Sequence, residues 1–305
     1  MELTRSCGVL LHITSLAGRY GTGTMGSEAR EFIDLLADNG ITYWQILPTG
    51  PVSKSMGYSP YSSLSCFAGN ELFIDTDSLK ENTWFRDEVP PPVIEEKHFA
   101  DFESARRYTF LVLEAAWDNF LNNATGDETE DFNNFCLTHG EQWLDEYSLY
   151  RVLSEKYGTY NWLQWDNKII TRDRDSIRAE EADLKERIIF WKFCQYVFFN
   201  QWLSMKEYAQ SRNIRIIGDI PIYMSMESAD SWTSINTLEI NYETMTPELV
   251  AGVPPDYFSS TGQLWGNPVY KWHNDSMELN EETYSWWLKR LKHALTLTDI
   301  IRIDH

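Results

Sequence analysis

Cysteine is scarce in this sequence, and the few cysteines present lack the spacing of a metal or redox motif. The 305 residues include Cys7, Cys66, Cys136 and Cys194, which form no C-x-x-C pair. Disulfide-stapled secreted domains are rich in cysteine, and structural zinc sites have closely spaced ligands. The sequence therefore argues against both classes, and we expect a reducing, cytoplasmic setting with no metal and no cofactor.

Basic residues and long apolar runs are also few. Lys and Arg number 26 against 46 Asp and Glu, a formal net charge of −20. Nucleic acids and anionic membranes attract basic surfaces, so neither is an expected partner. No apolar run approaches the length of a membrane span, and residues 7–18 are too short and too interrupted by polar residues for a signal peptide. A neutral substrate fits best, and the composition leaves the oligomeric state open.

Aromatic side chains are abundant. They make up 14% of the sequence, with 13 Trp and 16 Tyr. Most are expected to pack in the core. Others could line a groove in which the flat apolar faces of sugars stack, because Trp and Tyr also offer polar edges.

The first fifty residues predict a strand, a helix and a second strand. Residues 7–16 and 41–50 have the apolar character of buried strands. Residues 27–40 between them predict a helix with Ser27 as its N-cap and Gly40 at its end. This order is a βαβ unit, which indicates a parallel sheet.

The rest of the chain extends this pattern. Helices dominate about 80–213, where the charged stretch 171–187 is predicted as a solvated loop running into a helix. A third apolar strand is expected at 214–224, and a helix at 282–297 precedes a terminal strand. Four parallel strands with intervening helices predict an α/β fold, the N-terminal portion of a (β/α)8 TIM barrel with a large helical insertion. Residues 1–305 would form one barrel domain that lacks the barrel's C-terminal half.

A glycine-rich segment at 21–26, GTGTMG, matches the G-x-G-x-x-G fingerprint of dinucleotide sites. The turn from the preceding strand is too long for that motif, and the next strand lacks a terminal acid for a ribose hydroxyl. These glycines are instead predicted to shape a surface loop.

The strongest candidate site lies on the terminal strand. Arg302 and Asp304 are two residues apart, so their side chains point to the same side. A nearby guanidinium keeps a carboxylate ionised, and a strand fixes its direction, as a nucleophile requires. Asp304 is therefore either a nucleophile that forms a covalent glycosyl–enzyme intermediate or a member of a buried structural salt bridge.

Three other segments follow predicted strands. The loop 57–63 carries Tyr61 and is either a plain turn or a substrate-contacting loop. Asp219 ends the third strand and either caps a neighbouring loop or binds substrate hydroxyls. Residues 251–272 are dense in Pro, Gly and aromatics and are predicted as a binding loop with little regular structure.

Several segments, in this order, resemble those of the amylomaltases, the 4-alpha-glucanotransferases of glycoside hydrolase family 77. They are GVLLHITSLAGRYGTGTMG, WQILPTGP, SPYSSLSCFAGNELFID, IIGDIPIYM, AGVPPDYFSSTGQLWGNPVYKW and IIRIDH. The resemblance runs from Gly8 to His305 and is weakest over about 80–180. It implies a cytoplasmic enzyme that cuts an α-1,4-glucan, such as a maltooligosaccharide, starch or glycogen. The enzyme would keep one part covalently on a nucleophile and pass it to the 4-hydroxyl of an acceptor sugar.

The resemblance also implies roles for single residues. Asp304 matches the nucleophile, and Arg302 and His305 flank it, one tuning its charge and the other bonding a sugar hydroxyl. The substrate-side positions of the family match Tyr61, Asp219 and Trp265. Tyr58 departs from the pattern, which has a small polar residue there.

Members of this family are considerably longer than 305 residues. The resemblance places the general acid/base glutamate and a second aspartate beyond His305, and a retaining mechanism needs both carboxyl groups. We therefore expect this chain alone to be inactive. Two alternatives stay open, an α-glucan hydrolase and a catalytically inactive α-glucan-binding protein.

Overall fold

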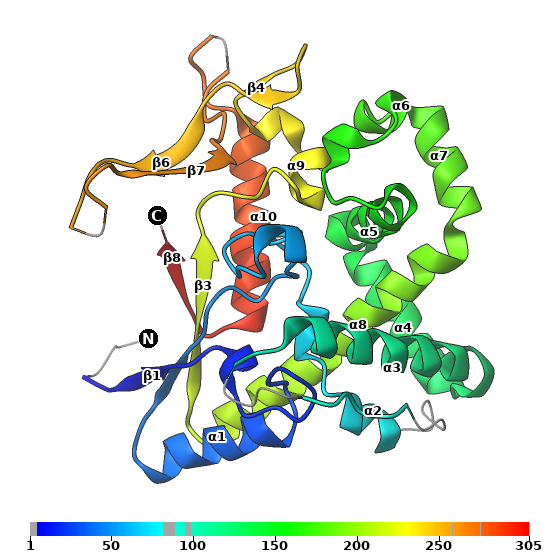
Figure 1. Cartoon of the computed structure of the whole chain (residues 1–305), viewed down its shortest axis with the longest axis vertical. Coiled ribbons are helices and arrows are strands. Elements are labelled where there is room, and N and C mark those ends of the chain that lie inside the picture. Colours follow the sequence, from blue (N-terminus) through cyan, green and yellow to red (C-terminus); the bar gives the residue numbers. More distant parts are fainter. Residues whose placement is uncertain (1–4, 82–88, 95–98, 258, 275, 305) are drawn as a thin grey trace.

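A parallel sheet of four strands, flanked by helices, organises the computed structural model (Figure 1). The structure describes residues 5–81, 89–94, 99–257, 259–274 and 276–304. The strands are β1 (Gly8–Leu10), β2 (Tyr43–Gln45), β3 (Arg215–Pro221) and β8 (Ile300–Asp304), and they pair in this order, all parallel. Sequential parallel strands with helical connections are the pattern of successive barrel strands. The predicted α/β class and strand series are confirmed.

Helices connect these strands and form the lower and right-hand parts of Figure 1. Helix α1 (Ser27–Asp38) joins β1 to β2, and α10 (Glu281–Leu297) precedes β8. The helices between β2 and β3 are α2 (Thr76–Glu81), α3 (Phe102–Asn123), α4 (Gly126–His139), α5 (Asp145–Tyr157), α6 (Asn167–Ile170), α7 (Arg174–Asp183) and α8 (Lys185–Ser211). The helical content predicted for this region is confirmed, whereas its status as an insertion in a barrel domain stays a prediction.

Several predicted boundaries need correction. Helix α1 begins at Ser27 itself, and its N-cap is Gly26, which has no side chain to cap the helix. A Cβ on Gly26 would lie 2.8 Å from the Asp75 carboxyl carbon, so this tight approach needs glycine. The charged stretch 171–187 was predicted to begin as a loop, but most of it is helical, in α7 and the start of α8. Asp173 caps α7 by accepting a hydrogen bond from the Ser176 amide, which explains why the helix begins at Arg174.

The glycine-rich segment 21–26 is not a surface loop. Gly21, Gly23 and Gly26 are all buried. A Cβ on Gly23 would lie 2.2 Å from the carbonyl oxygen of Ile13, so the segment packs directly against the backbone that follows β1. The prediction of a surface loop was wrong because close packing, as well as turn geometry, selects glycine.

The segment 251–272 also has more regular structure than predicted. Strands β6 (Val250–Val253) and β7 (Gln263–Pro268) pair antiparallel, and this hairpin extends past the end of β8 (Figure 1). A smaller pair, β4 (Ile240–Asn241) with β5 (Thr246–Pro247), lies near its base. Gly262 adopts a left-handed φ of 75° at the entry to β7, which glycine accommodates without strain.

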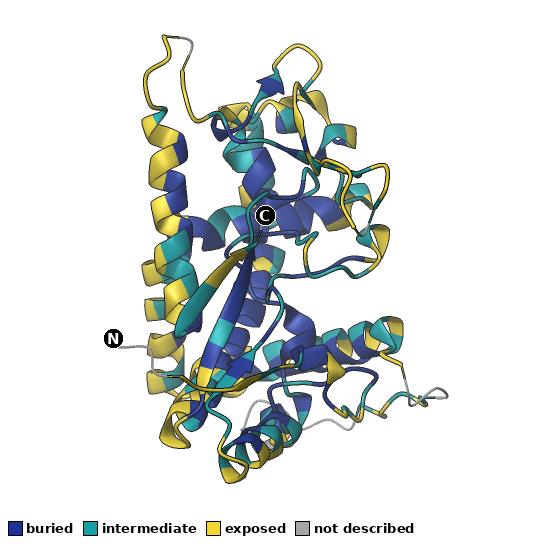
Figure 2. Ribbon diagram, turned by 90° about the vertical axis from the view of Figure 1, so that its left-hand side faces the viewer, coloured by how far each residue is buried: buried dark blue, intermediate teal, exposed yellow. Residues whose placement is uncertain are grey.

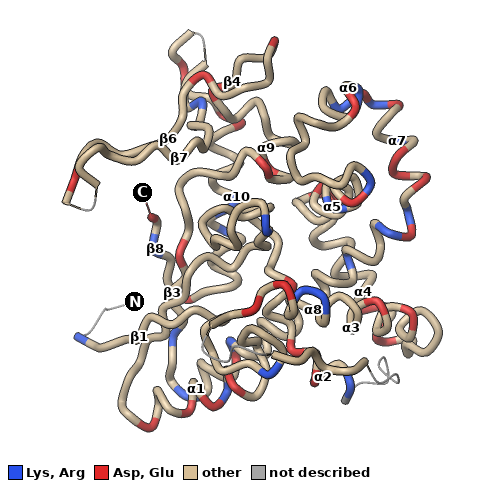
Figure 3. Tube along the Cα trace, in the orientation of Figure 1, with Lys and Arg blue, Asp and Glu red and all other residues tan. Residues whose placement is uncertain are grey.

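The core lies between the sheet and the helices, as the distribution of buried residues shows (Figure 2). Acidic residues occupy peripheral helices such as α1, α4 and α7 (Figure 3). None of the helices in the described ranges is long and apolar enough to cross a membrane.

One ion pair lies deep in this core. Arg151 on α5 donates to the Glu71 carboxylate at 3.1 Å, and their side chains are 1% and 3% exposed. Tyr147 donates to the same carboxylate oxygen at 2.6 Å, and the guanidinium lies 3.8 Å from the ring centroid of Trp191. Gln195 on α8 donates to Glu71 at 3.1 Å. The pair therefore ties the chain after β2 to two helices.

We predict that Glu71→Gln strongly destabilises the fold, because it leaves the Arg151 charge buried without a counter-ion. The expected loss in free energy of unfolding is about 3–5 kcal/mol, measured by urea denaturation. The matched control is Asp38→Asn, which breaks an exposed pair with Arg212 and should cost at most about 1 kcal/mol. Equal losses in the two variants would contradict the account.

A second prediction concerns His12, which follows β1 and is 9% exposed. Its Nδ1 atom has no hydrogen-bond partner among the described residues, and burial lowers its pKa from 6.5 to about 4. Between these pH values the unfolded chain binds a proton that the folded chain does not, so stability is lost as pH falls from 6.5 towards 4. His12→Leu should remove up to about 3 kcal/mol of this acid sensitivity.

The measurement is the free energy of unfolding between pH 7 and pH 4, with the exposed His273→Leu as control. Only the His12 variant should have a shallower pH dependence. A slope identical to that of the unchanged protein would show that His12 is protonated in the folded state.

Candidate active site

A cleft with a volume of about 360 Å³ opens at the carboxyl ends of β3 and β8. Its lining residues come from the loop after β2, the end of β3, β7 and β8: Ser59, Tyr61, Ser62, Pro221, Tyr223, Trp265, Asn267 and Asp304. The carboxyl ends of parallel strands are where active sites of α/β folds lie. Three predicted site residues, Tyr61, Trp265 and Asp304, therefore line one cleft. His305 lies outside the described residues.

Arg302 connects two carboxylates at this cleft. Its Nη1 donates to both Asp219 oxygens, at 2.8 and 2.9 Å, and its Nη2 donates to Asp304 Oδ1 at 2.7 Å. Asp219 and Arg302 are register partners across β3 and β8, so the sheet itself brings them together. The charge of Asp219 is the main cause of a raised pKa at Arg302. The prediction that Arg302 and Asp304 share one side of the strand is confirmed.

The terminal strand is only partly buried. The Arg302 side chain is 45% exposed and the Asp304 side chain 17%. Among the described strands β8 pairs only with β3, so it forms an edge of the sheet. The ion pair therefore lies at the mouth of the cleft, where solvent reaches the arginine, rather than in a closed interior.

Tyr61 links the loop after β2 to the same group. Its hydroxyl donates to Asp219 Oδ2 at 2.8 Å, and burial, with this bond, raises the pKa of Tyr61 to about 12. The Asp219 side chain is only 1% exposed. Arg302 donates to both of its oxygens and Tyr61 donates to Oδ2, so Asp219 fixes the two side chains against each other. That it also contacts substrate stays a prediction.

Aromatic rings form a wall on the other side of the cleft. The Trp265 ring centroid lies 6.4 Å from that of Tyr223, which lies 6.3 Å from the near-parallel ring of Tyr270. Trp265 Nε1 donates to Gln263 at 3.0 Å, and Asn267 anchors the hairpin by donating to the Met224 carbonyl at 2.9 Å. Tyr223 is not among the site residues predicted from the sequence, although its position shortly after Asp219 could have indicated it.

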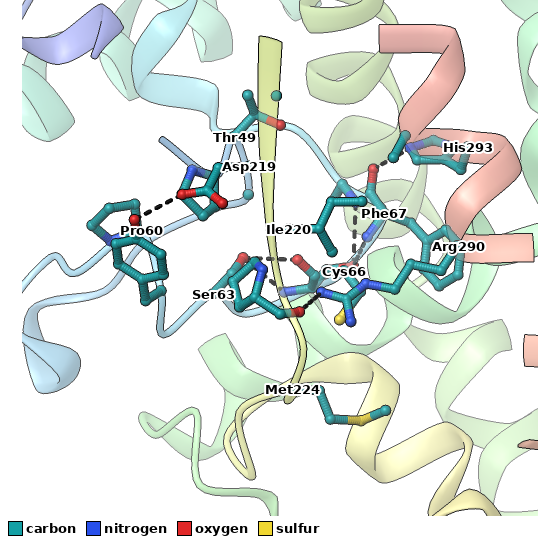
Figure 4. Close-up of a pocket in the computed structure, with 18 of the residues that line it drawn as sticks. Thr49, Pro60, Ser63, Cys66, Phe67, Asp219, Ile220, Met224, Arg290 and His293 are labelled. Atoms are coloured by element: carbon teal, nitrogen blue, oxygen red, sulfur yellow. Dashed lines mark hydrogen bonds between the residues drawn. The ribbon is translucent and has the colours of Figure 1, made fainter. Parts of the chain in front are cut away.

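A buried arginine supports the end of β3 from behind (Figure 4). Arg290 on α10 is 4% exposed and donates to the carbonyls of Pro221 and Ile222 at 2.6 and 3.0 Å. Figure 4 shows it on the opposite side of β3 from Asp219. The hydroxyl of Tyr270 donates to the Ile222 carbonyl as well, at 2.9 Å. Arg290 thus fixes the backbone between Asp219 and Tyr223.

The cleft combines an acidic side chain with aromatic and polar side chains. Within the described part of the chain, no group of three or more His, Cys, Asp or Glu residues is placed to hold a metal ion. An ionised carboxylate beside a guanidinium can attack an electrophilic carbon, and aromatic rings can stack on sugar faces.

Comparison with known proteins identifies the family of this chain. The Glyco_hydro_77 family model, described as 4-alpha-glucanotransferase, matches residues 11–305. The chain belongs to this family. It is similar to the 4-alpha-glucanotransferase of Clostridium butyricum, with 44% identity over 302 residues, 97% of this chain and 59% of that protein. It is 40% identical over 305 residues to that of Thermus thermophilus, covering 100% of this chain and 59% of the relative. The chain thus spans about three-fifths of the length of these 4-alpha-glucanotransferases.

Solved amylomaltases share the fold. The amylomaltase from Streptococcus agalactiae, determined in complex with acarbose, superposes with a TM-score of 0.86 at 35% identity, over 99% of this chain and 59% of that one. The amylomaltase from Corynebacterium glutamicum gives a TM-score of 0.70 at 19% identity, over 98% of this chain and 40% of that one, a likeness of fold alone. The resemblance to the glycoside hydrolase family 77 amylomaltases is confirmed.

We predict that Arg290→Met destabilises this 4-alpha-glucanotransferase-family chain, because carbonyls after β3 lose a buried donor. The expected loss is about 1–3 kcal/mol of unfolding free energy, measured by chemical denaturation. Lys289→Met, at the neighbouring exposed position of α10, is the control and should change stability by no more than about 0.5 kcal/mol. If Lys289→Met lowers the unfolding free energy as much as Arg290→Met does, the hydrogen bonds of Arg290 to the carbonyls do not account for its effect.

Proposed function

We propose that this chain supplies the nucleophile, Asp304, of a 4-alpha-glucanotransferase that acts on α-1,4-glucans. The observation that carries the proposal is the arrangement Asp219–Arg302–Asp304 at the mouth of an aromatic-walled cleft. It places the Asp304 carboxylate beside a guanidinium, at a space with stacking surfaces. Family membership and an acarbose complex of a similar amylomaltase support glucans as the ligand class.

The proposed reaction is a double displacement. An Asp304 carboxylate oxygen attacks the anomeric carbon of the donor glucan, the glycosidic C–O bond breaks, and the leaving oxygen takes a proton from a general acid. The 4-hydroxyl of an acceptor sugar then attacks the same carbon, gives its proton to the acid's conjugate base and releases Asp304. Arg302 donates a charge-assisted hydrogen bond to the Asp304 carboxylate before attack and after release.

The remaining predicted residues act on substrate in this proposal. Trp265 and Tyr223 offer ring faces for stacking, and Tyr61 presents its ring while its hydroxyl is held by Asp219. Asp219 holds Tyr61 and Arg302 in place beside the substrate, and His305 bonds a sugar hydroxyl beside the nucleophile. Transfer outcompetes hydrolysis if such surfaces hold an acceptor sugar in place of water.

A retaining mechanism needs a second carboxyl group about 5–5.5 Å from the first. Of the described residues that line the cleft, Asp304 is the one acidic side chain. Asp219 lies behind Arg302 with both oxygens engaged. We therefore propose that this chain alone binds α-glucan without catalysing its transfer. We also propose a cytoplasmic setting for the protein.

Calorimetric titration of the chain with acarbose or maltoheptaose tests the proposal. We expect saturable binding that weakens about tenfold or more in Trp265→Ala, because a stacking surface is lost. Tyr284→Ala removes a half-exposed tyrosine of α10 that does not line the cleft, and it should leave the affinity unchanged.

Oligosaccharide products are analysed in the same samples. No products are expected from this chain alone. Absence of binding, or equal affinity in Trp265→Ala, would refute the assignment of the cleft. Formation of longer and shorter oligosaccharides by this chain would refute the proposal that it lacks an acid.

A further inference from the structure

Tyr58 occupies a backbone conformation that residues with side chains seldom adopt. Its φ is 56°, and the preceding Gly57 has a φ of 62°. Such a left-handed tyrosine persists only where surrounding contacts determine it. Local bonds account for part of the turn, since the Tyr58 amide donates to the Ser53 carbonyl at 2.9 Å. Contacts of the Tyr58 side chain must supply the remaining stabilisation of this backbone conformation.

The Tyr58 side chain is held by the start of α3. Its ring stacks on Phe102 with centroids 4.8 Å apart and planes within 9°. Its hydroxyl donates to the carboxylate of Glu103, which also forms an ion pair with Lys54 at 3.0 Å. We call these four residues the Tyr58 latch. It joins the loop after β2 to the first turn of a helix in the long helical region.

The same loop is held at the cleft by Tyr61, three residues further on. Tyr61 donates to Asp219 on β3, whereas Tyr58 donates to Glu103 on α3. One short turn is therefore bonded to both elements. The turn between them is closed by backbone bonds, with the Ser59 amide donating to Met56 and the Ser62 amide donating to Ser59. A shift of the loop away from α3 would therefore move the ring of Tyr61.

We propose that Tyr58 is a positioning residue for glucan binding, which acts by latching the loop to α3 and so fixing Tyr61 in the cleft. The inference rests on the proposed function of that cleft. Tyr58 does not itself line the cleft, so its effect is exerted through Tyr61. The hydroxyl bond to Glu103 and the stack on Phe102 supply the two parts of the latch.

Hydrogen exchange of the amides of 54–62, measured by mass spectrometry, tests the latch without any ligand. Tyr58→Asn keeps a residue type that tolerates a left-handed φ but removes both contacts, so exchange should accelerate about tenfold or more. Tyr58→Phe keeps the stack and should have a smaller effect. Glu103→Ala removes the acceptor from the other element together with the Lys54 ion pair, so exchange should accelerate at least as much as in Tyr58→Phe. Adding Tyr58→Phe to Glu103→Ala should have no further effect, because the hydroxyl has then lost its acceptor already.

Titration with maltoheptaose gives the second readout. Tyr58→Asn should weaken binding by about threefold to tenfold, with the thermal midpoint nearly unchanged because the contacts are at the surface. The control is Tyr208→Phe, which removes a similar hydrogen bond, from Tyr208 on α8 to Asp34 on α1. It should change neither exchange of 54–62 nor affinity.

Each outcome is decisive. Unchanged exchange in Tyr58→Asn refutes the latch. Weaker binding with unchanged exchange means that Tyr58 contacts the sugar itself, which also refutes positioning. Faster exchange throughout the chain assigns Tyr58 a general structural role instead. If the unchanged protein binds no glucan, the proposed function fails, while the exchange experiment still decides whether the latch exists.

Discussion

The guanidinium of Arg302 lies between two carboxylates, and the geometry of the cleft depends on this contact. One carboxylate, Asp219, is almost completely buried, and buried carboxylates are costly unless they are paired and hydrogen-bonded. The other, Asp304, faces the cleft. Because Tyr61 donates to Asp219 as well, the same ion pair sets the position of a loop, a strand end and the candidate nucleophile.

Other buried polar contacts hold the elements on which this group depends. Arg290 fixes the backbone just after β3, and the pair of Glu71 with Arg151 ties the chain after β2 to the helices. The Tyr58 latch adds a surface contact to the same chain segment. Helices on both sides of β3 in the sequence thus support the cleft, although the cleft itself is lined by loops and strand ends.

Much of this arrangement follows from sequence patterns. Apolar runs separated by helical periodicity predicted the parallel strands, and the alternation of strand residues predicted that Arg302 and Asp304 share a side. The bond between Tyr61 and Asp219 joins residues 158 positions apart, so no local pattern could indicate it. The β6–β7 hairpin was missed because its Pro-rich and Gly-rich segment has the composition of a loop, while cross-strand pairing decides its structure.

The start of α1 illustrates a further limit. Ser27 has the chemistry of an N-cap, yet Gly26 takes that place because Asp75 lies against it. Such tertiary approaches override local preference. The left-handed tyrosine at position 58 is a similar case, since propensity alone would not place it there.

Covalent trapping with α-maltosyl fluoride tests the central claim, that Asp304 is aimed and charged for attack on an anomeric carbon. Fluoride leaves without protonation by an acid, so the C–F bond can break as Asp304 forms a bond to the anomeric carbon. Without a base to activate water or an acceptor hydroxyl, the maltosyl–Asp304 adduct should persist. The account predicts that mass spectrometry of the digested protein finds a maltosyl group on Asp304, and none in Asp304→Asn. An adduct on another residue, or no adduct under conditions in which maltoheptaose binds, would contradict it.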